Sequence, residues 1–290
     1  MRRFVSFLSV FVFVSLLNQS HLFAEDSIQI KGSDTMVNLG QAWAESFMGS
    51  HPNALIAVTG GGSGTGITAL VNGTCDIAQS SREMSSKELD LAKSKGLDVQ
   101  DVVTAIDAIA FVVHPSNPVE QLTIDQLSDI FTGKITNWKE VGGKDEAMLA
   151  LSRERNSGTH VYVLEDVVRK GAKDNKDEFA ANVLMLPSSQ AIEQEVSSST
   201  AAIGYFGLGY LNSNVKALKI LNSKTGTHVA PSIETATDHT YPLSRPLHFY
   251  LPRKPEGAVK EFVDFALSDE GQKIVKETHF VPLPKEQAAA

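Results

Sequence analysis

Cysteine is almost absent from this sequence of 290 residues, in which Cys75 is the only one. A single cysteine cannot form an internal disulfide or build a thiolate metal site, and none stands near the N-terminus to carry a lipid. A buried, inert thiol is the expected state of Cys75. The eight histidines show neither HxxxH nor HxH spacing. The sequence therefore predicts no metal and no cofactor.

Positive charge is also in short supply. There are 26 Lys and Arg against 34 Asp and Glu, which gives a net charge of −8. The loss of Arg2 and Arg3 with an N-terminal segment, described next, would take the net charge to −10. Nucleic acid is therefore not an expected partner. A bound anion would have to be held by local donors against a repulsive overall field.

Long apolar runs are missing as well, except at the N-terminus. Arg2 and Arg3 precede an apolar run over residues 4–17, and polar residues then lead to Ala24. This order is typical of a secretory signal peptide, which we predict at residues 1–24 with cleavage after Ala24. The run is short for a membrane span, and no later run is long enough. We expect an exported, periplasmic protein that is soluble and not lipidated.

No motif of nucleophilic catalysis or of triphosphate binding is complete. A GxSxG elbow is absent, and although Ser157 and His160 could meet across one helical turn, no orienting acid or oxyanion hole is evident. Gly61 and Gly66 have the glycine spacing of a P-loop, but Ile67 occupies the place of its lysine. The acidic residues are scattered, as on a solvated surface. An enzyme is therefore not expected.

What the sequence does contain is a repeated arrangement in which a predicted strand ends in small polar residues just before a predicted helix. It occurs at residues 31–36, 60–66, 79–84 and 153–159. The first N–H groups of a helix lack intrahelical partners and point outward at the positive end of its dipole. In an open α/β sheet such strand ends lie together at the carboxyl edge, where ligands bind. Taken alone, segment 31–36 could equally be a capped helix, and segment 60–66 could be a bare linker.

The segment 153–159 is the richest of these in donors. Ser157 and Thr159 supply hydroxyls, and Gly158 allows the backbone to approach a ligand closely. Arg153, four residues before Ser157, adds a planar guanidinium that can bond two oxygens of a phosphate or carboxylate. A capped helix after a polar loop also explains this segment on its own. The recurrence of the arrangement favours a receptor for an oxyanion.

Two apolar strands, predicted at residues 102–113 and 247–251, divide the chain. We interpret them as crossovers between two α/β lobes, each with a mixed sheet flanked by helices, joined by a two-strand hinge. Lobe I is predicted at residues 25–106 and 246–290, and lobe II at residues 107–245. Because the donor segments fall on both lobes, closure of the hinge could enclose a ligand.

Residues 127–143 resemble, almost letter for letter, a signature of the phosphate-binding proteins of bacterial ABC importers, the PstS-like branch of the periplasmic binding proteins. Residues 60–66, residues 80–84, Arg153 with residues 157–159, and residues 203–206 match further blocks, so the resemblance covers nearly all of the chain after residue 24. It implies the type II periplasmic binding fold. It also implies that a monomer grips dehydrated inorganic phosphate between its lobes and delivers it to the membrane-embedded permease of an ABC importer.

By motif position, the resemblance also implies a set of phosphate ligands. They are Ser33, Thr35, Met36, Ser63, Gly64, Thr65, Ser81, Arg82, Arg153, Ser157, Gly158 and Thr159. In better-known members an aspartate accepts the proton that phosphate carries and sulfate lacks. Here Ser81 stands at about that place, beside Arg82, and Asp34 is the substitute candidate; the alternative is that Asp34 is an ordinary exposed loop aspartate. The alternatives are an exported phosphatase or other hydrolase on the same lobes, and a sensor that uses phosphate to fix its shape.

Overall fold

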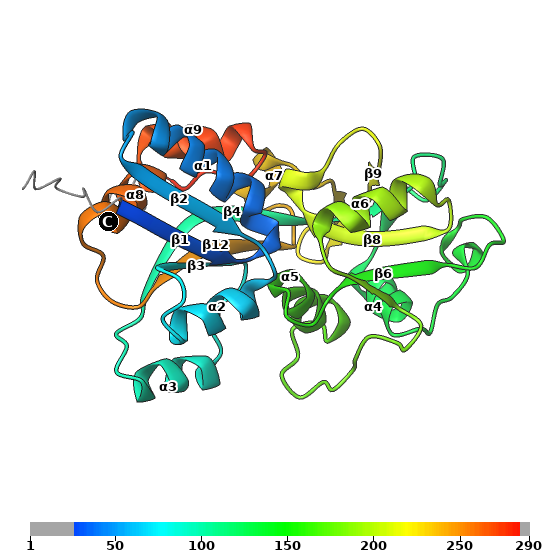
Figure 1. Cartoon of the computed structure of the whole chain (residues 1–290). Helices are drawn as coiled ribbons and strands as arrows, with labels where there is room; N and C mark the ends of the chain where they lie inside the picture. Colours follow the sequence, from blue (N-terminus) through cyan, green and yellow to red (C-terminus); the bar gives the residue numbers. More distant parts are fainter. Residues whose placement is uncertain (1–25, 285–290) are drawn as a thin grey trace, which may run out of the picture.

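The computed structural model describes residues 26–284, so the signal peptide predicted at residues 1–24 lies outside the described part of the chain. Two α/β parts share two long strands, β4 (Gln100–Val113) and β12 (Ser244–Leu251) (Figure 1). These strands pair antiparallel with each other, and β4 continues into the second part, where it pairs with β8 (Ala202–Gly207). The two predicted crossover strands are thus confirmed.

Strand pairing runs without interruption from one part to the other, in the order β2-β1-β3-β12-β4-β8-β6-β7, with β9 also beside β4. The remaining strands of this path are β1 (Asp26–Gly32), β2 (Ala54–Thr59), β3 (Ile77–Ser80), β6 (Leu149–Arg153), β7 (Leu184–Leu186) and β9 (Lys216–Ala217). The two mixed sheets of the predicted fold are therefore joined through β4 and β12. This α/β architecture confirms the predicted fold class.

In the first part, the parallel strands β2, β1 and β3 lie between two layers of helices (Figure 1). The helices are α1 (Val37–Ser50), α8 (Gly257–Leu267) and α9 (Asp269–Glu277) on one side, and α2 (Ser63–Val71) and α3 (Ser86–Ser94) on the other. The apolar face of α1 is buried: the Trp43 ring meets Phe249 edge to face at 5.5 Å, and Phe47 meets Phe262 at 5.5 Å. Burial of such rings stabilises this core.

The second part is built on β8, β6 and β7 and has its own aromatic core. Its helices are α4 (Ile124–Phe131), α5 (Gly158–Tyr162), the π-helix η3 (Val163–Val168), α6 (Ser189–Ser198) and α7 (Ile233–Thr237). A small sheet joins β5 (Gln121–Leu122), β10 (Lys219–Asn222) and β11 (Thr227–Val229). Short 3₁₀ turns occupy η1 (Asp34–Met36), η2 (Trp138–Val141) and η4 (Leu208–Tyr210). The Phe131 ring packs on Tyr205 at 5.5 Å and on Phe111 at 5.9 Å.

The two cores divide close to the predicted lobe boundaries. Ala105 and Leu247 pack in the core of the first part, whereas Ala108 and Leu243 pack in that of the second. Val281, beyond α9, also packs in the second core, so the chain end touches both parts. The boundaries at residues 106/107 and 245/246 remain a prediction that this division supports.

Local contacts set where two helices of the second part begin. α4 begins at Ile124, because Thr123 caps it and Leu122 pairs with β10 instead. α5 begins at Gly158, and the π-helix η3 continues it. Within residues 26–284, no helix has the length and apolarity that a membrane crossing requires.

Cys75 should be chemically inert in the folded chain. It is 7% exposed, packs among apolar residues of α2 and β3, and burial raises its pKa to about 11. Since the thiolate is the reactive form, we expect a disulfide reagent at pH 8 to modify native Cys75 on the order of 100-fold more slowly than the chain unfolded in guanidinium. A native rate within tenfold of the unfolded rate would contradict this packing.

Candidate functional site

Loops from both parts meet beside the hinge strands. Residues 33–36 follow β1, residues 63–64 begin α2 and Ser81 follows β3, while residues 157–159 lead from β6 into α5. β1 and β3 are parallel, so their carboxyl ends lie side by side at one edge of the sheet. The predicted convergence of these segments is present in the structure.

The centre of the site is a group of hydroxyls, here called the hydroxyl cluster. Its members are Ser33, Thr35, Ser63, Ser81 and Thr159, each at most 1% exposed. Ser33 Oγ donates to Ser81 Oγ at 2.9 Å, and Ser63 Oγ accepts from the Ser81 N–H at 3.0 Å. Thr35 Oγ1 and Thr159 Oγ1 lie 2.7 Å apart and join the two parts directly. Buried hydroxyls from segments far apart in the sequence therefore meet in one small volume.

Gly158 brings the second part against the hydroxyl cluster. A Cβ at this position would lie 2.4 Å from Ser63 Oγ and 2.7 Å from Ser81 Oγ, closer than real contacts allow. Only glycine lets the start of α5 approach these side chains. Gly158 thus sets how closely the lobes meet.

Ser157 caps α5, which was the alternative weighed for this segment. Its Oγ accepts from the N–H of Thr159 at 3.2 Å and of His160 at 3.4 Å. The Gly64 N–H donates across the parts to the Asn156 carbonyl at 3.0 Å. The hydroxyl proton of Ser157 is free to point toward a ligand, because the cap uses its oxygen only as an acceptor.

Arg153 ends β6 and is 1% exposed. Its Nη1 lies 2.9 Å from Asp34 Oδ2 and donates to Ser189 Oγ at 2.8 Å, while Nη2 donates to the Pro187 carbonyl at 2.9 Å. Nε is buried without a partner. Burial lowers the pKa of Arg153, and Asp34 opposes that shift. The guanidinium thus bridges the two parts as a buried cation.

Three predicted ligand residues have side chains for which no hydrogen bond to the hydroxyl cluster is present in the described part of the chain. The Arg82 guanidinium bonds Glu88 through Nη1 at 2.8 Å and Nη2 at 2.7 Å. Burial raises the pKa of Glu88, but the bonds from Arg82 and Ser85 outweigh it and lower that pKa. Thr65 is exposed and donates to the Gly61 carbonyl at 2.7 Å. The Met36 side chain is in the core, and its N–H donates to the Ser33 carbonyl at 3.1 Å.

Sequence reasoning missed two charged residues at the site, Asp107 of β4 and Arg245 of β12. Arg245 Nη2 lies 3.0 Å from Asp107 Oδ2 and donates to Thr159 Oγ1 at 2.7 Å. Both residues are at most 4% exposed. The sequence signal that could have revealed this pair is a carboxylate inside an apolar strand, because a buried carboxylate requires a buried partner. The sequence does not indicate which cation that partner is.

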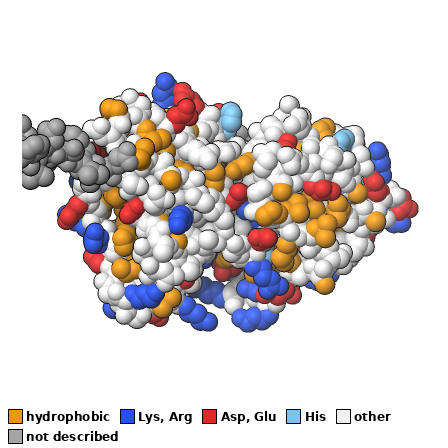
Figure 2. All heavy atoms as spheres, in the orientation of Figure 1, with side chains coloured by type: hydrophobic (Ala, Val, Ile, Leu, Met, Phe, Trp, Pro, Cys, Tyr) orange, Lys and Arg blue, Asp and Glu red, His pale blue; other side chains and the backbone are white. Residues whose placement is uncertain are grey.

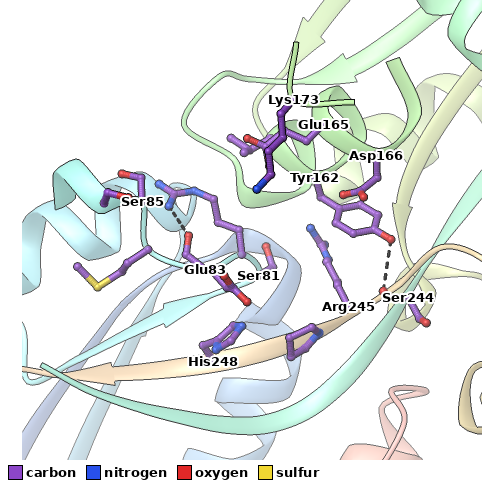
Figure 3. A pocket seen from close by; sticks show the side chains of 15 residues that line it. Ser81, Glu83, Ser85, Tyr162, Glu165, Asp166, Lys173, Ser244, Arg245 and His248 are labelled. Carbon is purple, nitrogen blue, oxygen red and sulfur yellow. Dashed lines mark hydrogen bonds between the residues drawn. The ribbon is translucent and has the colours of Figure 1, made fainter. Parts of the chain in front are cut away.

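A cavity of about 790 Å³ opens beside Ser81 and Arg245, between the two parts. Figure 3 shows Arg245 rising from β12 toward the Tyr162 ring, with His248 on the same strand. Charges of both signs line the cavity, including Arg82, Lys173, Glu165 and Asp166. The space-filling view shows the surface hollowed between the two parts, with Lys and Arg side chains near the lower end of the groove (Figure 2). The hydroxyl cluster thus lies next to a solvent-reaching groove.

The residues weighed for a hydrolase do not form a nucleophile and base pair. His160 Nδ1 lies 3.1 Å from Ser152 Oγ, and its ring stacks on Phe179 at 4.6 Å. Burial lowers the pKa of His160 to about 4, and Ser157 Oγ is engaged as a helix cap. Among the described residues no group of three His, Cys, Asp or Glu side chains could hold a metal ion. The arrangement fits binding rather than nucleophilic catalysis.

Comparison with known proteins agrees with this geometry. A family model described as a PBP superfamily domain matches residues 18–270. The phosphate-binding protein PstS of Pseudomonas aeruginosa is 34% identical over 89% of this chain and 83% of its own length. A substrate-binding protein from Clostridium perfringens, solved with bound phosphate, has a TM-score of 0.79 and 34% identity over 89% of this chain and 100% of its own. An ABC-type phosphate transport receptor from Vibrio cholerae has a TM-score of 0.69 and 30% identity over 89% and 100%.

The buried His160 should make the fold less stable in mild acid. Unfolded histidine takes up a proton near pH 6.5, whereas folded His160 resists protonation down to about pH 4. As pH falls between these values, protons therefore stabilise the unfolded state, at a cost of at most about 3 kcal/mol. Denaturant unfolding at pH 7 and pH 4 should show a smaller loss for His160→Gln than for the unaltered chain. His228→Gln, at a partly exposed position, is the matched control, and equal losses in all three proteins would contradict the assignment.

Proposed function

Because this chain belongs to the PBP superfamily, in its PstS-like phosphate-binding branch, we propose that it binds inorganic phosphate between its lobes and delivers it to an ABC importer. The observation that carries the proposal is the contact of buried hydroxyls from both lobes at one point. Its named relatives are binding and transport proteins, so the function is binding and not catalysis.

The hydroxyl cluster suits a dehydrated tetrahedral anion. Hydroxyls that bond one another, such as Thr35 with Thr159, can turn their protons to an oxyanion that enters between them. The donors are already oriented and buried, so each replaces a hydrogen bond from water at little ordering cost. Neutral donors add no charge of their own, which leaves the charge balance to Arg153 and its surroundings.

We propose that the direct ligands come from both lobes. They are Ser33, Thr35, Ser63, Ser81, Arg153, Ser157, Gly158 and Thr159. The remaining members of the predicted set would hold the neighbouring segments in position. Met36 and Gly64 would do so through their backbone N–H groups, Thr65 through its bond within the glycine-rich loop, and Arg82 through its bonds to Glu88. Opening of the lobes would expose the direct ligands to solvent.

Closure would involve contacts on both sides of the hydroxyl cluster. Tyr210 Oη donates to the Asp34 carbonyl at 2.9 Å, and Asn156 Nδ2 donates to the Gly61 carbonyl at 2.7 Å. These contacts join the lobes and must break when the hinge of β4 and β12 opens. Release of phosphate to the permease would follow that opening.

The cellular location, the oligomeric state and the partner of the chain are also proposals. The signal peptide at residues 1–24 would direct the chain to the periplasm, and with Cys75 as the only cysteine no lipid anchor is expected. A single chain supplies all the proposed ligands, so we propose that it acts as a monomer. Its partner is the membrane-embedded permease of the importer.

Loss of Arg153 should weaken phosphate binding. Arg153→Ala removes the buried cation and leaves Asp34, now without its partner, as a negative charge facing the anion. We expect an affinity loss of at least about tenfold, the scale of one charge-assisted hydrogen bond. Isothermal titration calorimetry with phosphate measures it. Arg155→Ala, the same change at an exposed position two residues on, should bind as the unaltered chain does. Equal affinity of both variants would remove Arg153 from the site.

Asp34 is the carboxylate placed to accept the phosphate proton. Its bonds to Arg153 and to the Ser189 N–H both use Oδ2, which leaves Oδ1 as an acceptor. Sulfate carries no proton at neutral pH and would meet this oxygen with repulsion. We expect Asp34→Asn to reduce the ratio of phosphate to sulfate affinity by at least about tenfold, in calorimetric titrations at pH 6 and pH 8. Asp90→Asn, at an exposed position, is the control. An unchanged ratio would assign the discrimination to other groups.

A further inference from the structure

The ion pair of Asp107 and Arg245 lies outside the predicted ligand set yet bonds one of its members. We propose that Arg245 is a further phosphate-site residue, which positions the Thr159 hydroxyl as a donor and offers Nη1 as an additional donor to the anion. This inference rests on the proposed function. It concerns which groups of the chain meet the ligand.

The Arg245 guanidinium has one fixed orientation. Arg245 and Asp107 are directly opposite each other on the paired strands β12 and β4. Asp107 Oδ2 accepts from Nε at 3.3 Å and Nη2 at 3.0 Å, while Oδ1 accepts from the Leu208 N–H at 3.0 Å. On the other side, the Tyr162 ring centroid lies 5.3 Å from the guanidinium carbon. Carboxylate and ring together hold the planar group in place.

The neighbouring backbone leaves room for this pair only because residue 207 is glycine. A Cβ at Gly207 would lie 2.7 Å from both oxygens of Asp107 and 2.8 Å from Thr35 Cγ2. Asp107 and Thr35 therefore pack against the same short stretch of β8. The ion pair and the hydroxyl cluster belong to one packed unit.

The bond from Arg245 determines the role of the Thr159 hydroxyl. A guanidinium has no acceptor, so in the 2.7 Å contact Nη2 donates and Thr159 Oγ1 accepts. The hydroxyl proton then points away from Arg245, and in the 2.7 Å contact with Thr35 Oγ1 either hydroxyl can be the donor. A fully ionised oxygen that entered there could only accept. Thr159 would donate to it, and the bond from the cation would strengthen that donation.

The Nη1 atom of Arg245 is buried without a hydrogen-bond partner. Nε and Nη2 share Asp107 Oδ2 along one edge of the fork, so the remaining Nη2 hydrogen, which reaches Thr159, lies on the Nη1 side. Nη1 is therefore on the same side as Thr159. A charged donor buried without an acceptor is costly, and an anion oxygen beside Thr159 would supply the acceptor.

The competing explanation is purely structural, with the ion pair serving only to hold β4 to β12. That role needs the bond to Asp107 but neither the bond to Thr159 nor a free Nη1. The two explanations differ in whether the effect of Arg245 depends on the Thr159 hydroxyl. A double-mutant cycle measures that dependence.

The test compares Arg245→Lys, Thr159→Val and the double variant by phosphate calorimetry. Lysine keeps the charge beside Asp107 but lacks the planar fork, so the variant should fold, which circular dichroism checks. We expect Arg245→Lys alone to lose at least about tenfold in affinity, and to lose at least about fivefold less when Thr159→Val is also present. Equal losses in both backgrounds, within twofold, would overturn the inference, as would full affinity of Arg245→Lys.

A matched control tests the purely structural explanation. Thr104 is a buried threonine, as Thr159 is, but it lies on β4. Its hydroxyl donates to the Leu247 carbonyl of β12 and not to a group of Arg245. The same cycle with Thr104→Val should show no coupling to Arg245→Lys. Coupling of similar size at Thr104 would mean that the hinge strands are merely loosened, and would overturn the proposal. If the unaltered chain bound no phosphate, the proposed function would fail, and this inference with it.

Discussion

The contact of the Thr35 and Thr159 hydroxyls, 2.7 Å apart, is the interaction on which the rest of the site depends. It joins the 3₁₀ turn η1 of lobe I to the first turn of α5 in lobe II, at a point where both side chains are buried. Gly158 and Gly207 permit this approach, because a side chain at either position would separate the lobes. The close packing at this point thus brings hydroxyls together rather than apolar groups. Buried hydroxyls need hydrogen-bond partners, and here the hydroxyls are hydrogen-bonded to one another.

Charge is arranged around this neutral centre in two buried pairs. Arg153 meets Asp34 across the lobes, and Arg245 meets Asp107 across the hinge strands. In each pair one guanidinium nitrogen stays buried without a partner, Nε in Arg153 and Nη1 in Arg245. A chain with an excess of acidic residues can therefore attract an anion locally without leaving a bare positive charge in its core. Both pairs would respond to an anion that took up the spare donors.

Much of this could be predicted from the sequence, because the signals were local. The apolar runs of β4 and β12 predicted the crossovers, and polar residues after short strands predicted where Thr35, Ser63 and Thr159 would meet. Side-chain partners were not predictable in the same way. The partner of Asp107 is 138 positions away on another strand, and Arg82 turned to Glu88 of the following helix. Local pattern places a residue on an element, whereas its bonds depend on which elements the fold brings beside it.

In the proposed function, groups from both lobes surround one tetrahedral anion. A crystal structure of the chain grown with phosphate would show this arrangement. The phosphorus atom should lie between the hydroxyls of Thr35 and Thr159, with their direct contact replaced by bonds to phosphate oxygens. A structure in which these two hydroxyls stay bonded to each other while phosphate lies elsewhere would contradict it.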